Sequence, residues 1–186
     1  MDWILAHPLS VLLLVMLPSL PLAWFGGSRG RVASAVLLVP GLVLAILGWS
    51  IDTPAESGDR TVASLIDRAV AGDAIGAGSW FQPDAVIHFG GFDQPAMPRR
   101  EIDRDLRSLE GRHRVEQHTT LLLRGRTIDT DLAEVDAGCL TRTQSSQMPV
   151  LTTWSFRVRR QADGTWRVQA VSFDRLAGSQ PRPGIF

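Results

Sequence analysis

Two long stretches without a charged residue constrain this chain more than any other feature of its sequence. They cover residues 3–28 and 32–51, and a short, arginine-containing connection separates them. A helix of about 20 residues rises about 30 Å, which matches the hydrocarbon thickness of a bilayer. Trp3, Trp24 and Trp49 stand near the ends of these stretches, and tryptophan favours the headgroup level. We therefore expect residues 1–51 to form a two-helix hairpin in a membrane.

The charges around the two stretches predict how the hairpin is oriented. Arg29 and Arg31 lie in the short connection, and positive residues in short loops stay on the cytoplasmic side. Both chain ends, with everything that follows residue 51, should then lie outside the cytoplasm. Only Met1-Asp2 precedes the first stretch, so the basic n-region of a signal peptide is missing. An uncleaved multi-pass anchor in the cell membrane is favoured over a cleaved signal peptide or two buried soluble helices.

The composition excludes several kinds of partner. The formal net charge is zero, which argues against a nucleic-acid-binding domain. Cys139 is the only cysteine, so no disulfide can form within the chain, and we expect it in the core. The histidines do not fall at metal-ligand spacing, and the glycine-rich segment 72–78 lacks the lysine of a phosphate loop. The sequence therefore predicts neither a metal nor a cofactor.

The remaining residues predict an α+β domain. Residues 52–58, with sequence DTPAESG, are polar and predict a linker, and residues 178–186 predict a loose tail. Between them, residues 59–177 carry two kinds of periodicity. The patterns predict helices at 59–71, 74–81 and 98–109, and strands at 85–89, 115–124, 128–143, 150–160 and 165–175. Segregated helices and hairpin-linked strands are typical of α+β folds. The expected core includes Leu65, Ile66, Trp154, Phe156, Trp166 and Val168.

Two segments of this domain carry a family resemblance. They are SWFQPDAVIHFGG at 79–91 and WSFRVRRQADGTWRVQAVSFDRL at 154–176, and the second includes a strong Asp-Gly hairpin turn. With the order of the predicted elements, they resemble the nuclear transport factor 2-like superfamily, in particular its SnoaL-like branch. This resemblance covers residues 59–177. It implies a cone-shaped domain in which a curved sheet wraps around helices and encloses a cavity. It also implies a tendency to form homodimers.

Three residues are candidates for catalysis. The resemblance places Phe89 where ketosteroid-isomerase relatives carry a catalytic aspartate, and a phenylalanine cannot take a proton. His88 is next to it but points to the opposite face of the strand. His118 and Asp136 lie on separate predicted strands that a curved sheet could bring to one cavity, where the carboxylate would orient the imidazole. Each of them can also be an ordinary structural residue, because strand register is not readable from one sequence.

These observations favour a non-catalytic domain at the cell envelope that binds a small apolar ligand or a partner protein. Two alternatives stay open. One is a cavity enzyme, isomerase- or dehydratase-like, with His88 or His118 as general base, because histidine titrates near neutral pH. The other is a structural module through which a membrane complex dimerises. The family that the domain resembles contains isomerases, dehydratases and epoxide hydrolases as well as proteins without catalysis.

We predict that the full-length chain stays with the membrane fraction, because both uncharged stretches reach bilayer length. A chain that starts at Thr53 is the control and should be soluble, since about 120 residues can bury a workable core. Recovery of the full-length chain without detergent would contradict the anchor. A reporter fused after Phe186 should be active only outside the cytoplasm, and cytoplasmic activity would reverse the orientation.

Overall fold

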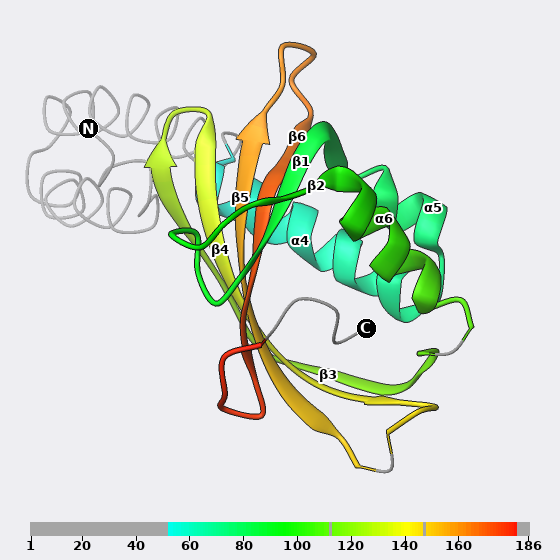
Figure 1. Cartoon of the computed structure of the whole chain (residues 1–186). Coiled ribbons are helices and arrows are strands. Elements are labelled where there is room, and N and C mark those ends of the chain that lie inside the picture. Colours follow the sequence, from blue (N-terminus) through cyan, green and yellow to red (C-terminus); the bar gives the residue numbers. More distant parts are fainter. Residues whose placement is uncertain (1–51, 112, 147, 182–186) are drawn as a thin grey trace, which may run out of the picture. The chain divides into compact units, whose positions relative to one another are not determined.

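A curved sheet of six strands carries helices on one of its faces (Figure 1). The structure is a computed structural model, and it describes residues 52–111, 113–146 and 148–181. The helices are α4 (Pro54–Val70), α5 (Ala74–Gly78) and α6 (Arg99–Ser108). The strands are β1 (Phe81–Phe89), β2 (Met97–Pro98), β3 (Val115–Asp129), β4 (Leu132–Thr143), β5 (Val150–Arg160) and β6 (Trp166–Leu176). This is the predicted α+β class.

The strands are ordered β2-β1-β6-β5-β4-β3 in a mixed sheet. Only β1 and β6 run parallel; the other neighbouring pairs are antiparallel. We call the face that packs against the helices the inner face, and the opposite one the outer face. Because side chains alternate along a strand, Ala133, Val135 and Ala137 of β4 are buried on the inner face, while Glu134 and Asp136 point outward.

Helix α4 begins earlier than the sequence pattern predicts. Residues 54–58, expected as part of a linker, form its first turns, and Pro54 stands at the helix start, where its missing N–H costs nothing. The proline and glycine of this segment misled the prediction, since both residue types also mark loops. The buried positions Gly58, Thr61, Val62 and Leu65 then follow helical spacing and face the sheet.

The first half of α4 lies unusually close to the sheet. A methyl group on Gly58 would lie 3.0 Å from side-chain carbons of both Ala133 and Val135. A methyl group on Gly125 of β3 would lie 2.5 Å from the carbonyl oxygen of Ala55. Neither glycine has a positive φ, so the reason for glycine at these positions is space and not backbone conformation.

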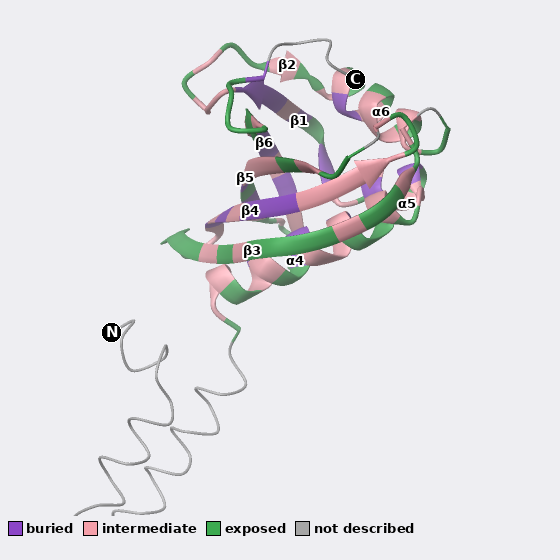
Figure 2. Cartoon of the chain, turned by 90° about the horizontal axis from the view of Figure 1, so that it is seen from below, coloured by how far each residue is buried: buried purple, intermediate pink, exposed green. Residues whose placement is uncertain are grey.

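The strands differ from the prediction mainly at β1, at β2 and at the turn between β3 and β4. Strand β1 starts at Phe81 instead of 85, and the preceding helix is correspondingly shorter. Strand β3 continues to Asp129, so the turn to β4 falls at 130–131. The short β2, which pairs with β1 through Met97 and Pro98, has no periodicity from which it could be predicted. Strand β3, which forms one edge of the sheet, is exposed along most of its length (Figure 2).

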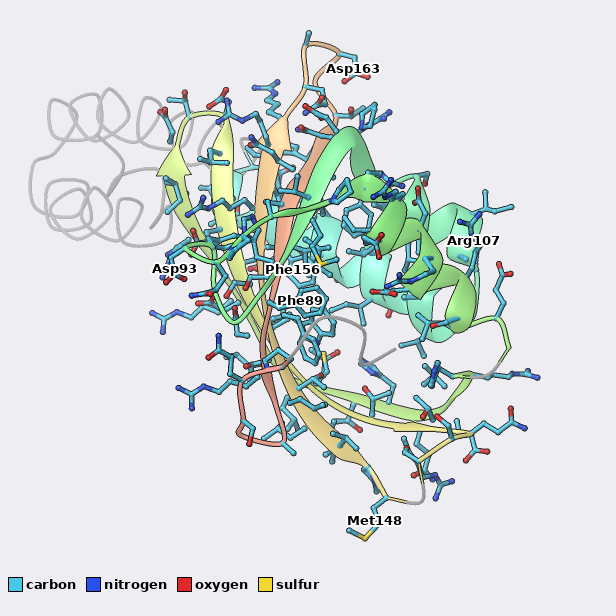
Figure 3. All side chains as sticks on the ribbon, in the orientation of Figure 1. Phe89, Asp93, Arg107, Met148, Phe156 and Asp163 are labelled. Carbon is cyan, nitrogen blue, oxygen red and sulfur yellow. The ribbon has the colours of Figure 1, made fainter. Side chains whose placement is uncertain are left out.

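The core lies between the inner face and the helices (Figure 2). Of the predicted core, Leu65, Phe156 and Val168 are buried, and Ile66, Trp154 and Trp166 are partly buried and pack against that cluster. Cys139 is buried, as expected. Figure 3 places Phe89 and Phe156 in this layer, whereas Asp93, Arg107, Met148 and Asp163 lie at the periphery.

The structure describes the predicted tail only in part and the predicted membrane hairpin not at all. In the tail, Ser179 forms a β-bridge with Leu176, and Pro181 is buried, so residues 178–181 are more ordered than expected; residues 182–186 lie outside the description. The predicted membrane hairpin at 1–51 also lies outside the described residues. In the part that is described, no helix has the length and apolar character needed to cross a membrane.

We predict that Gly125→Ala lowers the free energy of unfolding by about 1–3 kcal/mol, because the added methyl group forces α4 away from the sheet. Gly111→Ala is the matched control, since a methyl group there has no heavy atom within 4 Å. Urea denaturation of both variants, followed by circular dichroism, measures the difference. Equal stability of the two variants would show that this close approach does not constrain the helix.

Candidate functional site

A cavity of about 300 Å³ opens between the inner face and helices α4 and α6. Its walls are mainly apolar. The helices contribute Leu65, Ile66, Ala69, Val70, Ile102 and Leu106, and the sheet contributes Phe81, Ile87, Trp154, Phe156, Val171 and Leu176. A concave, apolar site with a few polar groups is the usual form of a small-molecule binding site in proteins, and this volume is at the lower end of the common range.

Trp154 on β5 forms a fixed part of the cavity wall. Its indole stacks on Phe173 of β6 with ring centroids 4.2 Å apart and planes inclined by 12°. Its Nε1–H donates to the hydroxyl of Thr152 at 3.0 Å, so the polar atom is satisfied within the wall. These contacts hold the ring in one orientation and present an aromatic surface to the cavity.

His118 on β3 also lines the cavity. Its Nδ1 is hydrogen-bonded to Thr141 Oγ1 at 3.0 Å and its Nε2 to Thr120 Oγ1 at 3.1 Å. The register pairs His118 with Thr141, which places both side chains on the inner face. Burial lowers the pKa of His118 below its usual value, and the charge of Asp67 opposes this only in part. The imidazole is therefore neutral at pH 7.

Asp105 on α6 is a cavity residue that the sequence analysis missed. Burial raises the pKa of this carboxyl above its usual value, although the nearby Arg104 opposes the shift. One signal could have revealed it. Ile102, Leu106 and Leu109 form the apolar stripe of the predicted helix, and Asp105, three residues after Ile102, falls on that same stripe. An acid within an apolar stripe points toward the interior.

His88 does not reach the cavity. The register pairs it with Ser172 of β6 on the outer face, opposite the inward-pointing Phe89. Its Nδ1 is hydrogen-bonded to the backbone carbonyl of Gln94 at 2.8 Å, and the edge of its ring meets Phe92 with centroids 5.5 Å apart. His88 thus joins β1 to the following loop. Phe89, the position of the acid in ketosteroid-isomerase relatives, is buried and meets Phe173 edge-on.

Asp136 is separated from His118 by the thickness of the sheet. It lies on the outer face of β4, opposite Arg124 of β3, and its carboxylate accepts a hydrogen bond from Ser155 Oγ at 3.1 Å. The same hydroxyl is 2.6 Å from Asp174 Oδ2. His118 pairs with Thr141, five residues further along β4 and on the inner face. The hypothetical His118–Asp136 pair is therefore not formed.

The Cys139 thiol also lines the cavity. Burial raises the pKa of this thiol, so it stays protonated at neutral pH. Within residues 52–111, 113–146 and 148–181, no three histidine, cysteine, aspartate or glutamate side chains come together as metal ligands would.

Comparison with known proteins identifies solved structures that share the fold of this domain at low sequence identity. No protein-family model matches the chain, and no curated protein matches it. A ketosteroid isomerase-like protein from Erwinia carotovora atroseptica superimposes with a TM-score of 0.52 and 14% identity, over 72% of this chain and all of that one. A protein provisionally named scytalone dehydratase, from Novosphingobium aromaticivorans, gives 0.52 and 11%, over 68% of this chain and 87% of that one.

A third structure, provisionally named ketosteroid isomerase, from Shewanella frigidimarina, gives a TM-score of 0.53 at 15% identity, over 67% of this chain and 97% of that one. Likeness at identities this low shows the fold alone. The domain thus has the nuclear transport factor 2-like fold, in agreement with the resemblance seen in its sequence.

We predict that the pKa of His118 lies below the ordinary histidine value of about 6.5. When the pH falls through this value, the unfolded chain takes up the proton first, so His118 lowers stability in acid. Proton NMR titration of imidazole signals measures the pKa, with the signal assigned by its absence in His118→Gln. That variant should also lose stability less steeply as the pH falls below 6.5. A pKa at or above the ordinary value would contradict the burial of this ring.

Proposed function

We propose that this domain binds a small, mainly apolar molecule in the cavity between α4, α6 and the sheet, and that it does so without catalysis. One observation carries the proposal: an apolar cavity exists, while His88 and Asp136, two of the three candidate catalytic residues, lie on the outer face. The uncharged stretches within residues 1–51 support a further part of the proposal, that the domain is held at the membrane, outside the cytoplasm.

The surroundings of His118 favour binding over proton transfer. A general base must reach the substrate proton, and a carboxylate usually orients such an imidazole. Here both ring nitrogens are engaged by threonine hydroxyls, and the orienting groups are neutral. A neutral imidazole between two hydroxyls is suited to hydrogen-bonding a ligand, because the hydroxyl rotors can adapt to the group that arrives.

A cavity enzyme is the second candidate, and the position of His118 favours it. The ring lines an apolar cavity and its lowered pKa keeps it unprotonated, as a general base requires. Structural neighbours named for isomerase and dehydratase activities support the same idea by fold analogy alone. A carbonyl or epoxide compound that the parent converts and that a folded His118→Gln variant does not convert would favour this candidate over the binding domain.

We predict that Ala69→Phe abolishes ligand binding, because the added ring occupies the cavity that Ala69 lines. The neutral probe 1-naphthylmethanol serves as the ligand, and isothermal titration calorimetry measures its affinity. Ala71→Phe is the matched control, since Ala71 is exposed and does not line the cavity. Equal binding by the two variants would place the bound probe elsewhere on the protein.

A further inference from the structure

Asp105 is an acidic side chain in the wall of an otherwise mainly apolar cavity. It lies on α6 between Ile102 and Leu106, two residues that line the same cavity, and its side chain is 19% exposed. Its backbone carbonyl accepts a hydrogen bond from Ser108 Oγ at 2.6 Å, which ties down the last turn of the helix and not the carboxylate. Asp105 is thus part of the wall that α6 contributes to the cavity.

The charge of Asp105 is poorly compensated by its neighbour. Arg104 approaches Asp105 Oδ1 with Nε at 3.3 Å and Nη2 at 3.2 Å, which are long distances for charge-assisted hydrogen bonds. The same guanidinium makes its short contact, 2.6 Å, with Glu101 Oε2, and its side chain is 54% exposed. An exposed arginine shared between two carboxylates neutralises neither of them fully.

The described residues of the cavity wall carry no permanent positive charge that would balance Asp105. Among the described residues that line the cavity there is no arginine. His118 is neutral at pH 7, and Asp67 on α4 acts on it with a second negative charge. His113 also lines the cavity and acts electrostatically on Asp105, whose pKa it lowers; it is hydrogen-bonded to Ser145 Oγ at 2.9 Å. Cations are therefore favoured over anions at neutral pH.

We infer that the ligand of this cavity is a small lipophilic amine, whose apolar body lies against Trp154 and whose ammonium group is bound by the carboxylate of Asp105. This inference rests on the proposed function and names its ligand class. A bound ammonium gives Asp105 a closer cationic partner than the long contact with Arg104, and it relieves the cost of burying that charge. The apolar remainder of such a ligand gains by leaving water for the aromatic and aliphatic walls.

Three matched probes test the inference. 1-Naphthylmethylamine is a cation at pH 7.5, 1-naphthylmethanol is neutral, and 1-naphthoate is an anion, while the ring system is the same. Affinities are measured by calorimetry on the full-length chain in lipid nanodiscs, with empty nanodiscs as the blank for partition into lipid. The variants are Asp105→Asn and Asp84→Asn. The second removes one negative charge from an exposed position outside the cavity, so it controls for net charge.

The expected result is that the parent and Asp84→Asn bind the amine about tenfold more tightly than the alcohol, and the naphthoate more weakly than either. In Asp105→Asn the tenfold preference is lost, while the alcohol binds as before. Asp105→Ser replaces Asp105→Asn if circular dichroism shows that the latter is unfolded.

Two other results overturn the inference in different ways. If the alcohol binds but the amine binds no better, or if the preference survives the loss of the carboxylate, Asp105 does not select the ligand and only this inference fails. If none of the three probes binds to the parent, the proposed function fails, and the inference with it.

Discussion

The close approach of α4 to the sheet is the constraint on which the rest of this domain depends. Gly58 on the helix and Gly125 on β3 let the first half of α4 lie almost against the strands, where no larger residue fits without displacement. The second half of the same helix, with Leu65, Ile66 and Ala69, lines the cavity. The cavity lies between this second half of α4, helix α6 and the inner face of the sheet.

Strand alternation then decides which chemistry the cavity can contain. Residues one position apart on a strand point to opposite faces, so the sheet separates His88 from Phe89 and Asp136 from the inner row that contains Cys139. The outer face receives Asp136, Asp174 and the serine between them. The inner face receives His118 with threonine hydroxyls. The sheet therefore lines the cavity mainly with apolar and neutral hydrogen-bonding groups. The acidic residue Asp105 is contributed by helix α6.

The sequence patterns predicted the elements of the domain better than the members of its site. Of the expected core positions, Leu65, Phe156 and Val168 are buried. His118 could be named as a candidate because histidine chemistry is visible in any sequence. Its partners could not be named, since a shift of one residue between β3 and β4 exchanges the faces. Asp105 was visible as an acid on an apolar stripe, but its meaning depends on what α6 packs against.

The sequence by itself determined the α+β class and the order of the elements apart from the short β2, because these follow from local periodicity. It also carries the two uncharged stretches on which the membrane prediction rests. Only the tertiary structure decided that α4 begins at Pro54, that a cavity exists, and that His118 and Asp105 line it while His88 and Asp136 do not. These features depend on strand register and on the distance between helix and sheet, which arise from contacts between residues far apart in the chain.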